Sequence, residues 1–228
     1  LIRINERNIT FIEADGGMWK LEARNTVKKY LEEDEADPNS KNDFGMNIIP
    51  ALLRDGRKMY AYRFAGYWRD VGTIDSLWEA NMEVLDPENS GIDIFDEKWK
   101  IYSRNSGMAG HHISETAEVT NSMITDGCKV SGSVKHSILF DGVTVEEGAT
   151  VEDAVVMGGT TIRSGAIVKH FIVAENVTIN EQAIVGAMPT AEEKGVATIA
   201  SDVSIGRGAK IGPNAMVRNN VKDGEEEW

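Results

Sequence analysis

An internal repeat with a period of 17 residues constrains the fold of this 228-residue chain more than any other feature. Three segments align in register from Ser137, Ala154 and Phe171, so that their starts lie 17 residues apart both times. Four columns of the alignment hold small or β-branched apolar residues in every copy: Ile138, Val155 and Ile172; Val145, Ile162 and Ile179; Ala149, Ala166 and Ala183; Val151, Val168 and Val185. A period near three hexapeptides with apolar residues in fixed columns indicates a triangular parallel β-helix, in which each coil buries its side chains against its neighbours.

The repeat extends beyond these three copies. A shorter copy begins at Ser122, and the pattern resumes at Thr198 after an interruption around "MPTAEEKGV", which makes about five coils. We therefore expect an all-β, left-handed parallel β-helix of hexapeptide repeats over residues 113–217, with the hand taken from hexapeptide helices in general. An acidic tail is expected over residues 218–228.

The single cysteine lies inside this repeat. Cys128 occupies a column whose other members are Val143, Thr160 and Val177. An apolar column predicts a buried structural thiol, since reactive cysteines need a polar, partly exposed surrounding.

Two histidines also recur at equivalent places in the repeat. His136 and His170 share a column with Asp153 and Ala187, and a polar, variable column favours a solvent-facing corner. The alternative is a general base of the kind that hexapeptide acyltransferases use. Such an enzyme also needs an acyl-donor site, for which the sequence gives no other sign.

The first half of the chain has a helical texture. The segment "MWKLEARNTVKKYL" (18–31) spaces its apolar residues as an amphipathic helix does, and the charged stretch "EEDEADPNSKND" after it is expected to be a solvated loop. Asp43 can cap a following helix that Pro50 kinks and Gly56 ends. "KMYAYRF" (58–64) alternates apolar and polar residues and predicts a strand.

The stretch "GYWRDVGT" (66–73) contains the most informative carboxylate. It is expected to continue as a second short strand, after which Thr73 caps a helix with an apolar face of Ile74, Leu77, Trp78, Met82 and Leu85. Asp70 would then lie between a strand end and a helix start, where α/β enzymes gather anion sites and metal-binding carboxylates. The alternative is a turn aspartate that binds its own backbone.

Composition excludes several classes of partner. The net charge of −13 and the pI near 4.8 disfavour binding to a phosphate backbone, so nucleic acid is not an expected partner. One cysteine argues against a disulfide framework, and no long apolar run or charged leader indicates a membrane span or signal peptide. A cytoplasmic protein is the expectation.

Three stretches of the chain carry a resemblance to a known family. The segment "NDFGMNIIPALLRDGRKMYAYRFAGYWRDVGTIDSLWEANMEVLD" resembles the end of the catalytic domain of bacterial glucose-1-phosphate adenylyltransferases. "IFDEKWKIYSRN" resembles the linker of that family, and the coils from Ile113 onward resemble its C-terminal β-helix. The implied fold is an α/β remnant of a nucleotidyltransferase (Rossmann-like) domain over residues 1–85, a linker over 86–112, and then the β-helix.

The resemblance implies a reaction and its components. ATP and glucose 1-phosphate would give ADP-glucose and pyrophosphate in glycogen biosynthesis, with Mg²⁺ as cofactor. In the family the aspartate of the "YW(K/R)DVGT" motif is a catalytic, metal-binding carboxylate, which corresponds to Asp70 here. Phosphorylated effectors and a homo-oligomer, with a tetramer as one form, are the further implied partners.

The chain also departs from the family pattern. It has no glycine-rich "GGxGTRL" loop to cradle a triphosphate and no match to the segment reading roughly "FEEKP". We therefore expect a C-terminal portion of the enzyme that is inactive alone but keeps a role in oligomerisation and regulation. One alternative is a non-catalytic regulatory subunit, against which the retained "WRDVGT" weighs; the other is the hexapeptide acyltransferase with His136 or His170 as base.

Overall fold

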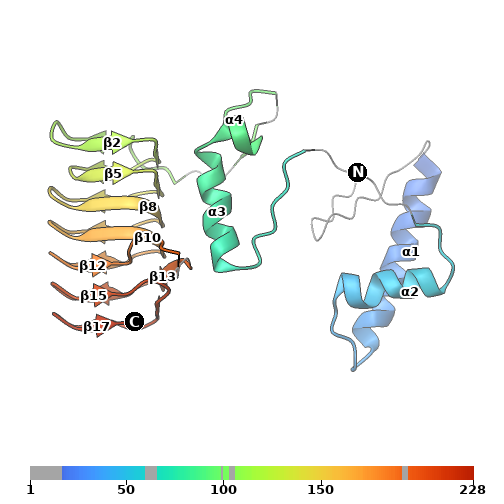
Figure 1. The fold of residues 1–228 in the computed structure, drawn as a ribbon. Coiled ribbons are helices and arrows are strands. Elements are labelled where there is room, and N and C mark those ends of the chain that lie inside the picture. Colours follow the sequence, from blue (N-terminus) through green and yellow to red (C-terminus); the bar gives the residue numbers. More distant parts are fainter. Residues whose placement is uncertain (1–16, 60–65, 99, 103–105, 192–194) are drawn as a thin grey trace. The chain divides into compact units, whose positions relative to one another are not determined.

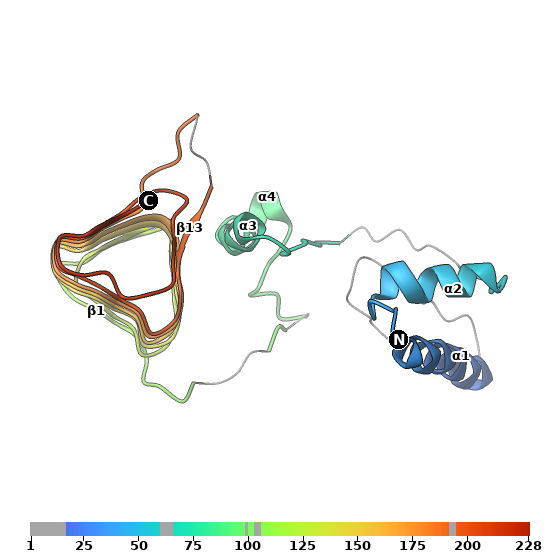
Figure 2. The same ribbon diagram turned by 90° about the horizontal axis from the view of Figure 1, so that it is seen from below.

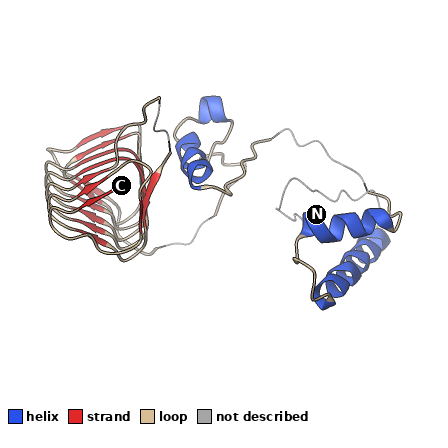
Figure 3. Ribbon diagram, turned by 60° about the horizontal axis from the view of Figure 1, so that its bottom comes forward, coloured by secondary structure: helices blue, strands red, loops and turns tan. Residues whose placement is uncertain are grey.

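The computed structural model describes residues 17–59, 66–98, 100–102, 106–191 and 195–228, with residues 17–24 described by their backbone only. The chain separates into two compact units, Leu1–Gly66 and Tyr67–Trp228. Figure 3 shows that the strands belong to the second of them. Among the described residues, no helix combines the length and apolar character that crossing a membrane requires.

The first helix is longer than the sequence pattern predicted. Helix α1 runs over Gly17–Ala36, so the acidic stretch 32–36, predicted as part of a loop, is helical instead. Ion pairs one turn apart join Lys28 to Glu32 and Lys29 to Glu33, at 3.4 and 3.6 Å between nitrogen and oxygen. Such pairs and the helix propensity of glutamate extend the helix until Pro38 stops it.

The second helix of this unit begins as predicted at Asp43. The Asp43 carboxylate accepts a hydrogen bond of 2.6 Å from the Met46 backbone N–H. A π-helical turn, η1 (Phe44–Ile48), leads into α2 (Ile49–Arg54), and Gly56 has the left-handed φ of 64° expected after a helix end. These helices share a small core of Tyr30, Ile48 and Leu52.

Two short strands were predicted before the helix that begins at Ile74, over residues 58–64 and 66–71. Most of the strand predicted over 58–64 lies outside the described residues. The described residues 66–73 contain no strand, so the prediction that "GYWRDV" is one is wrong. Asp70 therefore precedes a helix, and the described residues directly before it, 66–69, are not a strand.

The second half of the chain is a parallel β-helix, as predicted. Figure 1 shows its coils stacked along one axis, and Figure 2 shows their triangular outline. One face is a six-stranded sheet of β1 (His112–Ile113), β4 (Lys129–Val130), β7 (Thr144–Val145), β9 (Thr161–Ile162), β11 (Thr178–Ile179) and β14 (Ser204–Ile205). All the pairings between its strands are parallel.

The other two faces form one eleven-stranded sheet that bends around a corner. One face holds β2 (Glu118–Thr120), β5 (Ser133–Lys135), β12 (Ile184–Val185), β15 (Lys210–Ile211) and β17 (Glu226–Glu227). The other holds β3 (Met123–Ile124), β6 (Ile138–Leu139), β13 (Ala197–Ile199) and β16 (Met216–Val217). The long strands β8 (Thr150–Val156) and β10 (Ile167–Val173) pair on both faces and so turn the corner.

Three of the four predicted columns build the interior of the solenoid, but the fourth, Ile138, Val155 and Ile172, faces outward into a separate core shared with residues 74–85. Val145, Ile162 and Ile179 pair directly above one another, and each is at most 1% exposed. Cys128 is 1% exposed and burial raises the pKa of its thiol, so the prediction of a structural core cysteine is confirmed. The repeat therefore sets which side chains face inward.

The solenoid continues past the end that the sequence predicted. Residues 218–228, expected as an acidic tail, contain β17, whose Glu226 and Glu227 pair in parallel with Lys210 and Ile211. Along that face the described residues form seven successive strands, where about five coils were predicted. The last coil keeps one residue of an apolar column, Val221, which is 5% exposed and bridges Ile205, while the Lys210–Glu226 ion pair of 2.7 Å lies on its outside.

A helix covers part of the outside of the solenoid. Helix α3 (Ile74–Val84) is followed by the short α4 (Pro87–Ser90), and both belong to the second unit. The predicted apolar face of α3 packs on outward-facing side chains from three successive coils, Ile138, Val155 and Ile172. Helix α3, which ends the segment that resembles the catalytic domain, thus shares a core with the β-helix.

Neighbouring coils are also linked by a ladder of charges on the outer surface. Glu152 lies between Lys135 and Lys169 in register, with oxygen–nitrogen distances of 3.0 and 3.2 Å. Its hydrogen bonds with Lys135, and then with Lys169, hold the pKa of the Glu152 carboxyl below its usual value.

This ladder gives a pH-dependent contribution to stability. A carboxyl whose pKa is lower in the folded state stabilises the fold above its unfolded pKa of about 4.3, and this contribution disappears as pH falls through the lowered folded pKa. Glu152→Gln should therefore lower the free energy of unfolding by about 0.5–1 kcal/mol at pH 7 and by less at pH 3. Urea denaturation at both pH values measures this, and an equal loss at both would refute the ladder.

Candidate active-site segment

Asp70 lies on an exposed segment immediately before α3. Its Oδ1 atom accepts a hydrogen bond of 3.0 Å from the backbone N–H of Gly72. This is the turn geometry that the sequence left open as an alternative, and it is present. A turn bond uses one oxygen of the carboxylate, so the geometry is compatible with a second role for Asp70.

The start of α3 is capped as predicted. Thr73 Oγ1 accepts from the Ser76 backbone N–H at 3.2 Å, and Ser76 Oγ accepts in return from the Thr73 N–H at 3.0 Å. This reciprocal pair fixes the direction in which the chain enters the helix. Asp70 is therefore tied through a turn to a rigid helix start.

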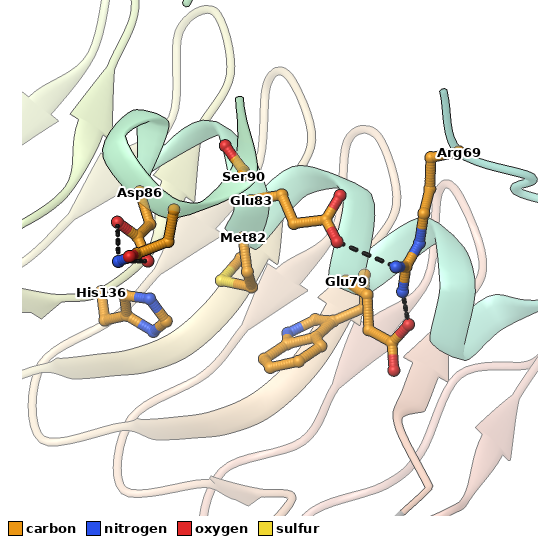
Figure 4. A pocket seen from close by; sticks show the side chains of 9 residues that line it. Arg69, Glu79, Met82, Glu83, Asp86, Ser90 and His136 are labelled. Carbon is orange, nitrogen blue, oxygen red and sulfur yellow. Dashed lines mark hydrogen bonds and ion pairs between the residues drawn. The ribbon is translucent and has the colours of Figure 1, made fainter. Parts of the chain in front are cut away.

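Two side chains before Asp70 are bound to α3. The Tyr67 hydroxyl donates to Glu83 Oε2 at 2.6 Å, and an Arg69 nitrogen lies 2.9 Å from Glu83 Oε1. Arg69 also pairs with Glu79, one helical turn earlier (Figure 4). Burial, followed by the hydrogen bond to Glu83, raises the pKa of Tyr67 to about 12, so its hydroxyl remains a donor at neutral pH.

The sequence reasoning did not identify Glu79 and Glu83. The two glutamates are four residues apart on α3 and lie off its apolar face. Their partner Arg69 lies upstream, in the "GYWRDVGT" stretch. Acidic residues at this spacing usually face water on a helix surface, which is why the pattern alone gave them no role.

A hollow of about 440 Å³ lies where α3 and α4 meet the solenoid (Figure 4). Its lining combines one cation, three carboxylates and an apolar floor: Arg69, Trp78, Glu79, Met82, Glu83, Asp86, Asn89, Ser90 and His136. Arg69 is paired with two of the carboxylates, Glu79 and Glu83, while the third, Asp86, accepts hydrogen bonds from the Asn89 side chain.

The prediction of a solvent-facing corner is wrong for His170, which packs against α3, whereas Ala187 in the same column is exposed. His170 is 7% exposed and meets the edge of Trp78, with ring centroids 4.5 Å apart. The Trp78 indole N–H donates to the Asp153 backbone carbonyl at 2.8 Å, and His136 pairs with the Asp153 side chain. The sequence could not show this, because α3 lies far away along the chain.

His136, Asp153 and His170 form one corner of the solenoid, and the backbone of each is in the left-handed conformation. Their φ angles are 44° for His136, 51° for Asp153 and 50° for His170. Asp and His enter this region more readily than most residues, which explains the composition of the column. The packing of Trp78 over His170 argues against a general-base role for that histidine.

No group of three or more His, Cys, Asp or Glu side chains that could hold a metal ion occurs within the described ranges. A complete protein-only metal cage is therefore not part of the described structure. Mg²⁺, however, is commonly held by one or two carboxylates together with substrate phosphates, and an exposed lone carboxylate suits that arrangement.

Two family models match the chain. The model described as "Nucleotidyl transferase" matches residues 18–87, and the model described as "GlmU-like, C-terminal hexapeptide" matches residues 108–205. The chain therefore joins part of a nucleotidyl transferase domain to a hexapeptide β-helix, which is the predicted fold class.

The chain is also similar to bacterial proteins named glucose-1-phosphate adenylyltransferase. It is 56% identical over 128 residues to the one from Clostridium beijerinckii, which is 56% of this chain and 33% of the relative. It is 51% identical over 135 residues to that of Clostridium perfringens (59% and 33%), and 52% identical over 127 residues to that of Bacillus cereus (56% and 34%). These matches confirm the resemblance, and the chain spans about a third of the length of these relatives.

Proposed function

We propose that this chain is a segment of a glucose-1-phosphate adenylyltransferase, which makes ADP-glucose and pyrophosphate from ATP and glucose 1-phosphate for glycogen biosynthesis. The observation that carries the proposal is 56% identity over 128 residues to an enzyme of that name. The same order of nucleotidyl transferase and hexapeptide matches along the chain supports it. ATP and sugar phosphates are cytoplasmic metabolites, so the cytoplasm is the proposed location.

Asp70 is the proposed catalytic and metal-binding residue. It is an exposed carboxylate on a segment fixed to the start of α3, and its turn bond uses one oxygen. Together with the phosphates of ATP, Asp70 would hold Mg²⁺, which neutralises phosphate charge as the reaction proceeds. The residues before it, Tyr67 and Arg69, hold the segment and do not need to contact the nucleotide.

The domain boundary that the sequence resemblance gives differs from the boundary that packing gives. Residues 67–85 resemble the catalytic domain in sequence, yet α3 within them shares a core with the β-helix. We propose that this helix connects the reacting carboxylate to the solenoid. Subunit association and binding of phosphorylated effectors through the β-helix are the further proposed roles.

The 228 residues alone are expected to make no ADP-glucose, since they contain no glycine-rich loop for the triphosphate. A chimera tests the proposal: in the Clostridium beijerinckii enzyme, the 128 residues of this chain that match it replace their counterparts. The chimera should form ADP-glucose from ATP, glucose 1-phosphate and Mg²⁺, while the isolated chain should sediment as a homo-oligomer and form none.

Each arm of this experiment can fail separately. A chimera that folds and assembles but forms no ADP-glucose would contradict the proposed function. Turnover of a coenzyme A thioester by the isolated chain, lost with His136→Ala, would support the acyltransferase alternative instead. ADP-glucose formed by the isolated chain would show a nucleotide site within these residues and refute the proposed inactivity.

A further inference from the structure

The Glu83 carboxylate on α3 binds two side chains upstream of Asp70, those of Tyr67 and Arg69, which are two residues apart. Glu83 Oε2 accepts from the Tyr67 hydroxyl at 2.6 Å, and Glu83 Oε1 lies 2.9 Å from an Arg69 nitrogen. Each oxygen of the carboxylate therefore serves one of the two residues. Glu79 supplies a second contact to Arg69 from one turn away on the same helix.

This pairing determines which way the intervening residues point. Side chains at positions i and i+2 that reach the same carboxylate lie on one side of the segment, as in extended backbone. Trp68 and Asp70 alternate with them and so face the opposite side. The exposure agrees, because Trp68 is 43% exposed and Asp70 is classed as exposed, whereas Tyr67 is half-buried.

We propose that Glu83 is a positioning residue for Asp70: by binding Tyr67 and Arg69 to α3, it holds the segment so that the Asp70 carboxylate faces away from the helix, toward the substrates. The inference rests on the proposed function of Asp70. It adds a role for a residue that contacts neither substrate nor metal.

Helix α3 has its own attachment to the solenoid, which separates this role from a general structural one. Trp78 donates to the Asp153 carbonyl at 2.8 Å, and Asp75 accepts from the Val196 N–H at 2.9 Å. Met82 is 6% exposed within the core that α3 shares with the coils. Because alanine is the best helix former, Glu83→Ala should free the segment while leaving α3 folded and docked.

Trypsin provides a direct measure of this release in the 228-residue chain. Cleavage after Arg69 requires the arginine side chain to leave Glu79 and Glu83 and enter the protease. Glu83→Ala should speed that cleavage at least about fivefold, since the local opening becomes more populated. Cleavage at other exposed lysines and arginines, followed by mass spectrometry, is the internal reference.

Glu88→Ala is the matched control. It removes the same charge from an exposed position on α4, within the same unit, without touching Tyr67 or Arg69. Its cleavage rate after Arg69 should match the unaltered chain. Equal cleavage rates in the unaltered chain, Glu83→Ala and Glu88→Ala would overturn the inference. If circular dichroism shows that Glu83→Ala unfolds the solenoid, Glu83→Gln, which keeps an acceptor for Tyr67, takes its place. A Glu83→Gln chain that is cleaved after Arg69 no faster than the unaltered chain would then overturn the inference.

Kinetics of the chimera separate this inference from the proposed function. Glu83→Ala should lower kcat about tenfold or more with KM for both substrates nearly unchanged, because misplacement of a reacting group affects turnover more than binding. If Asp70→Asn lowers kcat and Glu83→Ala does not, the positioning role is wrong. If Asp70→Asn itself has no effect, the proposed role of Asp70 fails.

Discussion

Ile162→Asp is expected to abolish cooperative folding of the solenoid. The side chain is completely buried between Val145 in one neighbouring coil and Ile179 in the next. A carboxylate there would lose its water without gaining a cation, at a cost of about 3–5 kcal/mol in addition to the lost apolar packing. That sum is comparable with the whole stability of many domains, about 5–15 kcal/mol.

The residue before it provides the matched control. Thr161 belongs to the same strand, β9, but its side chain faces outward between those of Thr144 and Thr178. Thr161→Asp places the same charge one residue away and should cost no more than about 0.5 kcal/mol. Thermal unfolding followed by far-ultraviolet circular dichroism compares the two, and similar melting temperatures would contradict the inward and outward assignment of the columns.

The interior of the solenoid could be predicted because the repeat gives several copies of each position, and together they show which side chains face inward. One coil with Val145 facing inward is weak support, but the same column holds Ile162 and Ile179, and a parallel stack requires all of them to face the same way. The final coil had less of this support. It adds only Val221 to the column, and its other pairing, of Glu226 and Glu227 with Lys210 and Ile211, is through the backbone, which leaves no trace in composition.

Contacts between elements that are distant in sequence could not be predicted from the spacing of residues along the chain. His170 had the composition of an exposed corner, and only the presence of Trp78 from α3 makes it buried. Glu83 had the spacing of an ordinary solvent-facing helix residue, yet it binds two residues of the motif. His170 is covered by the predicted apolar face of α3, whereas Glu83 acts from a different face of the same helix, and neither contact can be read from the spacing of residues within one element.

The two interpretations of Asp70 make different predictions for one pair of substitutions. Asparagine keeps an oxygen that can accept the Gly72 N–H at 3.0 Å, so the turn should survive in Asp70→Asn. Alanine removes both the turn bond and the charge. A residue that only forms a turn would tolerate asparagine and suffer from alanine.

Asp70→Asn is therefore expected to abolish most ADP-glucose formation by the chimera, with kcat reduced about 10²–10⁴-fold, because the neutral amide is a poor ligand for Mg²⁺ beside the phosphates. Asp70→Ala should lose as much activity, and more Mg²⁺ should recover only part of it in either variant. Steady-state rates over a Mg²⁺ titration, with circular dichroism to confirm the fold, measure this. Full activity in Asp70→Asn together with loss in Asp70→Ala would reduce Asp70 to a turn residue, and the metal ligand would then have to be sought outside this segment.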